Sequence, residues 1–257
     1  MRKPLIMGVA LLLALSGPVG AQLSDDFDSY ADQAAFNAVW SWGSTVSPMS
    51  LTNNNWVSAP NSIYQGTSAQ QSYRKISTGI PLQQLYFGFD FYDERGTASV
   101  ARTYGMVYAR QGTSWSGSLN QIIAVGKWNA QPTSATKYHA RIAFGSLNWF
   151  VLDQGPDRSV GWHRAEVIGG VDPDDPTKAK VDIYIDGILG KTVTGLTNHT
   201  FNWVVMGSNL TSSHGMYFDN VVVRVIPEPV FFQFGSMAVL GALGLKRASA
   251  LRSRKTS

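Results

Sequence analysis

The feature that most limits the fold is the stretch from Gln22 to Val225, in which short β-rich runs are separated by clusters of Gly, Asn, Pro and Ser. Several runs alternate apolar and polar residues, as residues 137–144 do, and successive side chains of a strand point to opposite faces. Helical periodicity is limited to one short turn expected within residues 30–39. The pattern predicts an all-β sandwich of two antiparallel sheets, with strands at residues 85–92, 104–110, 121–128, 137–144, 149–152, 160–168, 180–185, 188–193, 201–206 and 216–225.

The first 21 residues have the composition of a secretory signal peptide. Arg2 and Lys3 form a basic start, residues 5–15 are apolar, and small residues up to Ala21 form a cleavage site. Because the apolar stretch is too short to span a membrane, we expect a signal helix that signal peptidase removes after Ala21. An uncleaved N-terminal anchor is the alternative.

The segment from residue 226 to residue 257 combines a rigid polar break, an apolar run and a basic end. Pro227, Glu228 and Pro229 precede the apolar residues 230–245, and Lys246 and Arg247 follow them. A positive cluster resists crossing a membrane and stays on the cytoplasmic side. As a helix, the apolar run would be roughly 24 Å long, just short of a bilayer core of about 30 Å. The segment is therefore expected to be a hydrophobic helix that holds the chain at a membrane.

This order of parts resembles the PEP-CTERM sorting signal of bacterial envelope proteins. The resemblance covers Pro227 to about Lys255 and implies recognition by an exosortase, a membrane cysteine protease, with cleavage near Pro227, Glu228 and Pro229. A plain C-terminal membrane anchor is the alternative. We therefore divide the chain into a signal peptide (1–21), a β-sandwich domain (22–225) and a sorting or anchor segment (226–257). We expect export to the cell envelope or the extracellular space, with transient anchoring at the C-terminus.

The basic charge of the chain belongs to its two ends. The whole chain carries a net charge of +4, but seven of its 21 Lys and Arg residues and one of its 17 acids lie in the end segments. Residues 22–225 keep 14 basic and 16 acidic residues, a net charge of about −2. A nucleic-acid-binding domain carries a basic patch or stripe, so no nucleic-acid partner is expected.

The chain contains no cysteine. In an exported protein this excludes both disulfide cross-links and a thiol nucleophile. About 200 residues are enough for one domain with its own apolar core. Stability must therefore come from that core, with an ion as a further contribution.

Two stretches resemble a strand pair of laminin-G-like and concanavalin A-like jelly rolls. The first is the run from Trp162 to Val167, and the second is the run from Val181 to Gly187, which ends in a Tyr-x-Asp-Gly hairpin. Asp-Gly favours a two-residue turn because that turn needs positive φ angles. The resemblance implies a jelly-roll sandwich. It does not imply one function, since the superfamily includes lectins, glycosidases and adhesion modules.

Acidic residues that could catalyse glycoside hydrolysis are scarce. Hydrolysis needs two carboxylates roughly 5 to 10 Å apart, and the Glu-x-Asp-x-x-Glu motif of laminarinase-type jelly rolls is absent. The domain has two glutamates, Glu94 and Glu166, which lie far apart in sequence. The sequence therefore predicts that the protein is not an enzyme, with a jelly-roll glycoside hydrolase as the least favoured alternative.

Aspartates at both ends of the domain suggest structural calcium. Asp25 and Asp26 open the domain and Asp219 lies in its last expected strand. First and last strands of sandwiches often pair, and calcium takes six to eight oxygen ligands. The alternative for Asp219 is hydrogen bonding to loop amides, because a half-buried carboxylate needs a partner.

Aromatic residues are abundant, with 8 Trp, 10 Tyr and 12 Phe. Sugars bind through their CH faces laid on aromatic rings. Trp115 and Trp56 lie in polar loops and are predicted to bind a ligand, whereas Trp162 and Trp203 are expected in the core. The sequence thus predicts a non-catalytic envelope or matrix protein that binds a polysaccharide, with a structural or adhesive protein without a small ligand as the alternative.

Overall fold

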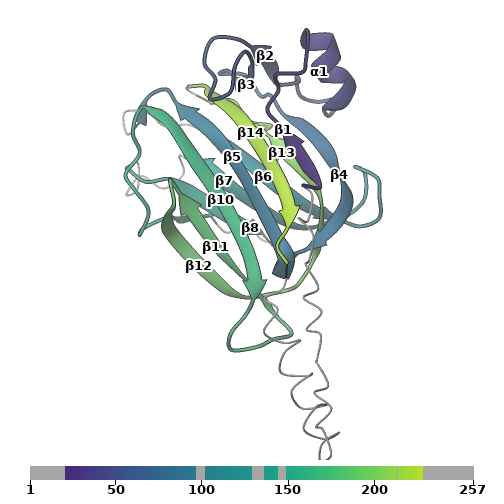
Figure 1. The fold of residues 1–257 in the computed structure, drawn as a ribbon, viewed down its shortest axis with the longest axis vertical. Helices are drawn as coiled ribbons and strands as arrows, with labels where there is room; N and C mark the ends of the chain where they lie inside the picture. Colours follow the sequence, from purple (N-terminus) through teal and green to yellow (C-terminus); the bar gives the residue numbers. More distant parts are fainter. Residues whose placement is uncertain (1–20, 97–101, 129–135, 144–148, 213, 228–257) are drawn as a thin grey trace, which may run out of the picture. The chain divides into compact units, whose positions relative to one another are not determined.

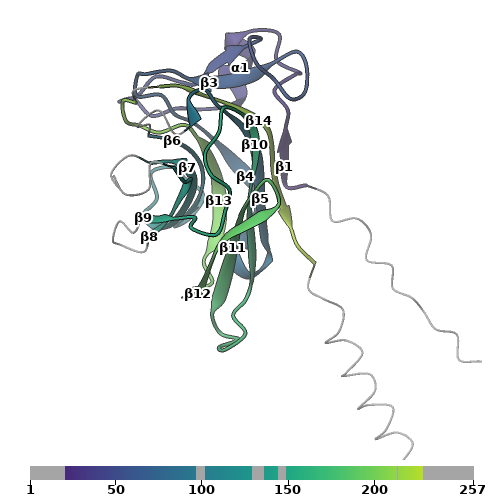
Figure 2. The same cartoon turned by 90° about the vertical axis from the view of Figure 1, so that its left-hand side faces the viewer.

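The computed structural model of the chain describes residues 21–96, 102–128, 136–143, 149–212 and 214–227. These residues form two antiparallel sheets that pack face to face as two layers (Figures 1 and 2). The prediction of an all-β, two-sheet sandwich is confirmed. Val225 ends the last strand and also the compact unit to which the sandwich belongs.

The first layer, sheet A, has eight strands. Its order is β12-β11-β10-β5-β14-β3-β2, and β1 pairs with β14 outside this path. The strands are β1 (Leu23–Asp25), β2 (Ser50–Thr52), β3 (Ser62–Gln65), β5 (Leu85–Asp93), β10 (Gly161–Val171), β11 (Ala179–Ile185), β12 (Ile188–Leu196) and β14 (Met216–Val225).

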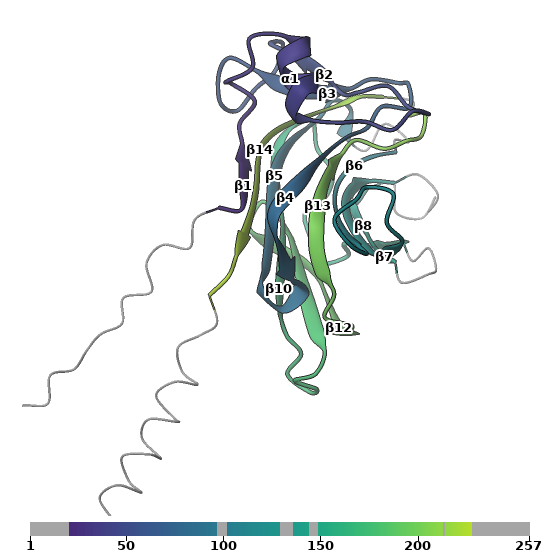
Figure 3. The same cartoon turned by 90° about the vertical axis from the view of Figure 1, so that its right-hand side faces the viewer.

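The second layer, sheet B, has six strands in the order β4-β13-β6-β7-β8-β9. Seen from the edge, β13, β6, β7 and β8 lie in one layer and β1, β14 and β5 in the other (Figure 3). The strands of sheet B are β4 (Ser72–Pro81), β6 (Thr103–Arg110), β7 (Leu119–Lys127), β8 (His139–Ala143), β9 (Trp149–Val151) and β13 (Thr200–Met206).

The expected pairing of the domain's first and last strands and the expected Asp-Gly hairpin are both present. Strand β1 pairs with β14 antiparallel, so the first and last strands of the domain are neighbours. Strands β11 and β12 are joined by Asp186 and Gly187, whose φ angles are 53° and 74°. Two positive φ angles match the twist of the flanking strands, which is why this dipeptide makes the turn.

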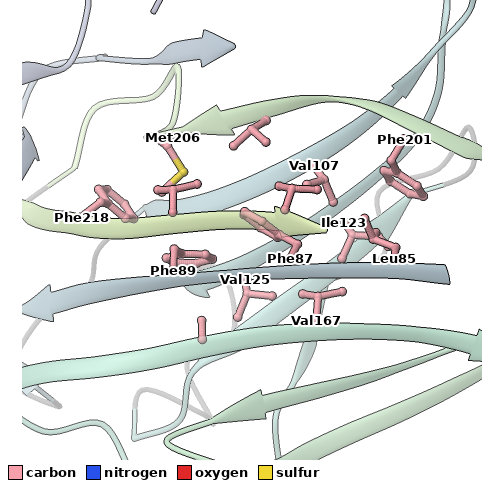
Figure 4. Packing of buried hydrophobic residues seen from close by; sticks show 14 of the residues in the cluster. Leu85, Phe87, Phe89, Val107, Ile123, Val125, Val167, Phe201, Met206 and Phe218 are labelled. Atoms are coloured by element: carbon pink, nitrogen blue, oxygen red, sulfur yellow. The ribbon is translucent and has the colours of Figure 1, made fainter. Parts of the chain in front are cut away.

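The apolar core lies between the two sheets. Figure 4 shows side chains of β5 and β14 meeting those of β6, β7 and β13. Phe87 and Phe89 are fully buried beside Val107 and Ile123. Burying one such side chain contributes about 1.5–3 kcal/mol, so the core supplies the stability that a chain without cysteine needs.

Of the two tryptophans that the sequence predicts in the core, one is buried and one is not. Trp203 is buried, in a second apolar cluster on the side of sheet B that faces away from sheet A. Trp162 is half-buried and packs against Tyr92, while its neighbour His163 is buried beside Phe91 and Tyr138 of the core. Apolar character alone does not tell which face of a strand is inward when both faces are covered.

One ionic cluster lies inside the sandwich. The carboxylate of Asp93 contacts Lys127 Nζ at 3.1 Å and Arg158 Nε at 3.2 Å, and all three side chains are almost completely buried. Asp93 also accepts backbone N–H bonds from Arg95 and Gly96. Burial raises the pKa of Asp93, but the charges of Lys127 and Arg158 outweigh burial and lower it overall. The cluster joins the ends of β5 and β7 electrostatically.

The helix α1 (Gln33–Val39) lies at the end of the sandwich near β2 and β3 (Figure 1). It is preceded by Asp32, whose side chain accepts the N–H of Ala35 and so caps the helix. Its buried residue, Phe36, packs against Phe27 and Trp40. In the part of the chain that the structure describes, no helix is long and apolar enough to cross a bilayer.

Candidate functional site

The outer face of sheet B, meaning the side chains that point away from sheet A, carries a second apolar cluster. On β6, Val107 and Ala109 face the core, whereas Tyr104, Met106 and Tyr108 belong to the outer cluster. This follows from the period of two in a strand. Both faces of β6 are therefore covered by large side chains, which is unusual for a sheet layer that faces only water.

The strand register places these outer side chains in rows across sheet B. One row runs from Tyr73 of β4 through Val205, Met106 and Ala124 to Arg141 of β8. Arg141 is in turn paired with Trp149 of β9. Aromatic rings and an arginine thus flank an apolar centre.

One end of this face is formed by the Trp115 group, which consists of Tyr73, Tyr108, Arg110, Trp115 and Trp203. The indole of Trp115 stacks on Tyr73 with ring centroids 3.7 Å apart and on Tyr108 at 5.6 Å. The Cζ of Arg110 lies 4.2 Å from the Trp115 ring centroid, and its Nη1 donates to the carbonyl of Gly117. The loop that carries Trp115 is therefore held against the sheet.

The other side of the face is formed by the Trp149 group, which consists of Arg102, Tyr104, Trp128, Arg141 and Trp149. Trp128 and Trp149 stack with centroids 4.4 Å apart and planes 4° apart. Tyr104 packs against Trp149, and the Cζ of Arg141 lies 5.9 Å from the Trp149 centroid. Arg102 lies over the Trp128 ring.

The charged side chains in the strands of sheet B are all basic. Its six strands contain five Lys or Arg residues and neither Asp nor Glu. Burial lowers the pKa of Arg110 and of Arg141, and the groups that oppose this are tyrosine hydroxyls. Among the described residues, neither arginine forms an ion pair, and the Nε atoms of both are buried without a hydrogen-bond partner.

An arginine of sheet A shows the contrast. Arg164 donates to Asp90 Oδ1 at 3.1 Å and also lies near Tyr86. Although burial lowers the pKa of Arg164, the Tyr86 hydrogen bond and the Asp90 charge outweigh it and raise the pKa. The two arginines of sheet B therefore differ from Arg164 in lacking a carboxylate partner within the described residues.

Two buried tyrosines complete the face. Burial raises the pKa of Tyr104 to about 12 and raises the pKa of Tyr108. Both hydroxyls therefore keep their protons at neutral pH. They can donate a hydrogen bond, but the raised pKa makes each of them a weaker acid than an ordinary tyrosine.

The fold is shared with solved structures of other proteins, whereas no family model and no curated sequence matches the chain. The globular domain of T. cruzi calreticulin superposes with a TM-score of 0.54 and 11% identity, over 90% of this chain and 96% of that chain. A carbohydrate esterase of the Shiga toxin-encoding bacteriophage phi24B gives a TM-score of 0.52 and 11% identity, over 81% and 100%. A glycoside hydrolase family 16 endo-glucanase from Bacteroides ovatus gives 0.51 and 11%, over 78% and 99%. The fold is a jelly roll.

These structures correct the expectation that the protein is not an enzyme. Two of the three are enzymes that act on carbohydrates. The sequence argument disfavoured a glycosidase because one two-carboxylate motif is absent, and that absence bears on one mechanism only. The fold itself accommodates catalysis.

The two tryptophans predicted to bind a ligand lie in different places. Trp115 is part of the outer face of sheet B. Trp56 lies in the loop between β2 and β3 with 42% of its surface exposed, and it does not belong to the outer cluster. The sequence did not single out Tyr73, Arg110 or Arg141, whose place on the face depends on strand register.

The predicted calcium ligands do not converge in the described residues, where no group of three or more His, Cys, Asp or Glu side chains could hold a metal ion. Asp25 is engaged by Tyr30 Oη at 2.6 Å, Trp40 Nε1 at 2.9 Å and Arg74 Nη1 at 2.6 Å. The carboxylate of Asp26 accepts the N–H of Asp28. The three donors to Asp25 all contact its Oδ2, and its Oδ1 accepts the N–H of Phe27.

Asp219 follows the alternative that the sequence left open. Its Oδ2 accepts the backbone N–H groups of Val57 and Ser58 at 2.8 and 3.0 Å, and its Oδ1 accepts the N–H of Asn220. Burial outweighs these bonds and raises the pKa of Asp219 to about 6. The carboxylate thus fixes the β2–β3 loop to the last strand, and calcium binding stays a prediction.

The predicted sorting residues Glu228, Pro229, Lys246 and Arg247 lie outside the described residues, as do residues 1–20. Ala21 and Pro227, which border them, are exposed and belong to no strand or helix.

Proposed function

We propose that the domain is a carbohydrate-active protein that binds a polysaccharide across the outer face of sheet B. The observation that carries this proposal is the pair of aromatic groups on one sheet face, centred on Trp115 and on Trp149. The rings of Trp115, Trp128 and Trp149 are half-buried and keep part of their surface open for sugar CH groups, and adjacent arginines and tyrosines offer donors for hydroxyls. The jelly-roll fold supports the proposal, since carbohydrate-acting enzymes share it.

The test is binding of the purified protein to a panel of soluble polysaccharides, measured by affinity electrophoresis and titration calorimetry. Trp115→Ala should weaken binding at least roughly tenfold, or about 1.4 kcal/mol. Trp56→Ala is the matched control, because this exposed indole lies outside the outer cluster. Equal losses in both variants, or no binding to any polymer, would overturn the proposal.

A second candidate function is cleavage of the bound polysaccharide. The observation in its favour is that Tyr104 and Tyr108 lie on this face near Arg141, whose charge acts to lower the pKa of both hydroxyls against the burial that raises it. A tyrosine hydroxyl beside a cation can serve as a general acid for the oxygen of a leaving sugar while water attacks the sugar carbon. Chromatography of oligosaccharide products, with Tyr108→Phe as the variant expected to lose activity, decides between binding alone and cleavage. Unchanged product formation by Tyr108→Phe would exclude Tyr108 as the acid.

The place where this activity is used follows, in our proposal, from the two ends of the sequence. Export through the signal peptide and sorting through the PEP-CTERM-like segment 226–257 would bring the domain to the cell envelope, with signal peptidase and an exosortase as partners. Mass spectrometry of the exported protein tests this. Peptides from residues 238–257 in the mature exported protein would refute processing at the segment.

A further inference from the structure

The structure assigns an anionic polysaccharide, one that carries uronic acid carboxylates, as the ligand of the outer face of sheet B. This inference rests on the proposed polysaccharide-binding function and names its substrate class. It starts from the charge of the sheet. The six strands contain five basic residues and no acid, and two of the five, Arg74 and Lys127, are paired with aspartates of sheet A.

Two arginines of the face are placed for such a ligand. Arg110 and Arg141 are half-buried, and among the described residues no carboxylate lies within ion-pairing distance of either. Their partners are aromatic rings, with Arg110 over Trp115 and Arg141 over Trp149. Burying a charge without a counterion is costly, so a bound anion would relieve a cost that the free protein bears.

The same chain shows how its other buried charges are satisfied. Lys127, which faces the core of the sandwich, is paired with Asp93, and Arg74 is paired with Asp25. On the outer face of sheet A, Arg164 is paired with Asp90. The unpaired state of Arg110 and Arg141 is therefore a property of the outer face of sheet B and not of the whole protein.

The spacing of the two arginines suits a polymer better than a small anion. Arg141 belongs to β8, two strands away from β6, and is in register with Met106 of β6. Arg110 belongs to β6 itself, four residues after Met106. A rise of about 3.3 Å per residue and a strand spacing of about 4.8 Å place their Cα atoms roughly 16 Å apart. Because the two guanidinium groups also lie over different tryptophans, Trp115 and Trp149, a chain of several sugars suits the face better than a single one.

The planar fork of arginine explains the choice of carboxylate. Guanidinium groups bind carboxylates with two parallel hydrogen bonds, which lysine cannot reproduce. The Nε atoms of both guanidinium groups are buried, and Nη1 of Arg110 already donates to the carbonyl of Gly117. Arg141 can therefore offer its two Nη atoms to a carboxylate, whereas Arg110 can offer its Nη2. A uronate unit offers a carboxylate for this edge and a sugar ring for the neighbouring aromatic surface.

The experiment compares polygalacturonate, a neutral β-glucan and dextran sulfate as ligands of the full protein, by titration calorimetry at two salt concentrations. We expect polygalacturonate to bind most tightly and to weaken as salt rises. Arg141→Gln and Arg110→Gln should each weaken polygalacturonate binding roughly ten- to a hundredfold. Arg141→Lys should recover only part of the loss.

The matched control is Arg224→Gln. Arg224 also lies over an aromatic ring, with its Cζ 4.3 Å from the Tyr86 centroid, but it belongs to β14 of sheet A. It should leave the affinity unchanged, and circular dichroism should show that each variant is folded. An equal loss in Arg224→Gln, or tighter binding of dextran sulfate than of polygalacturonate, overturns the inference.

Two further outcomes separate this inference from the proposed function. If the neutral β-glucan binds and polygalacturonate does not, the uronate inference fails while polysaccharide binding stands. If none of the three polymers binds, the proposed function fails as well.

Discussion

The buried cluster of Asp93, Lys127 and Arg158 allows the most exacting test of how the sandwich is held together. Asp93→Asn keeps the size of the side chain but removes its charge. Lys127, fully buried, would then lose its ion-pair partner, and Arg158 would lose the carboxylate oxygen 3.2 Å from its Nε. Removing one partner of a buried pair costs about 3–5 kcal/mol, because the remaining charge is left uncompensated.

The same reasoning predicts an asymmetry between the two partners. Lys127→Met removes a cation but leaves Asp93 with Arg158 and with the N–H groups of Arg95 and Gly96. It should therefore cost less than Asp93→Asn. In the Lys127→Met background, Asp93→Asn affects the contact with Arg158 but no longer the pair with Lys127, so its cost should fall by about 1–3 kcal/mol.

The assay is urea unfolding followed by circular dichroism, with melting temperature as a second readout. A loss of 3–5 kcal/mol in a domain of this size corresponds to a decrease of roughly 6–20 °C in Tm. The control is Asp153→Asn, which breaks an exposed pair with Lys191 and should leave Tm unchanged. Equal effects of Asp93→Asn and Asp153→Asn, or a larger effect of Lys127→Met than of Asp93→Asn, would refute the reasoning.

Three other perturbations test the aspartates. The pKa of Asp219, raised to about 6 from 3.8, means that the folded state binds more protons between these values. This carboxyl therefore makes unfolding free energy fall as pH rises from about 4 to 6, and Asp219→Asn should remove that fall in urea titrations across this range. Asp25→Asn should lower stability by about 2–4 kcal/mol by weakening bonds to Tyr30, Trp40 and Arg74, seen as a lower urea midpoint; an unchanged midpoint would contradict this. Equal Tm in calcium and in chelator would dismiss structural calcium.

Much of the sandwich could be predicted from the sequence because its central strands carry strong local signals. Strands β5 to β14 follow the expected runs within a few residues, since each has apolar alternation and a turn signal at its end. The short strands β1, β2 and β3 and the long strand β4 were missed. In β4 the adjacent charges of Arg74 and Lys75 interrupt the alternation, and its partner β13 lies more than a hundred residues away.

The outer face of sheet B could not be predicted in the same way. Trp115 was recognised from its polar loop, but its stacking partner Tyr73 belongs to the missed strand β4. Arg141 and Trp149 become neighbours only through the register of β8 and β9. A shift of one residue would turn each side chain of a strand to the other face. The residues that make up the outer face can therefore be predicted only when the register of every strand is known.

The distribution of charge between the sheets connects these observations. The strands of sheet A contain six acids, and each accepts at least one hydrogen bond that fixes structure: Asp25, Asp90, Asp93, Glu166, Asp182 and Asp219. Those acids are occupied in holding strands and loops together. The strands of sheet B contain no acid, and their outer arginines face aromatic rings. A sugar that is recognised by carboxylates of the protein would bind sheet A, whose strands contain the acids. A sugar that itself carries carboxylates would bind the arginines of sheet B. Because Arg110 and Arg141 have no carboxylate partner within the described residues, we favour binding of a carboxylate-bearing sugar to sheet B.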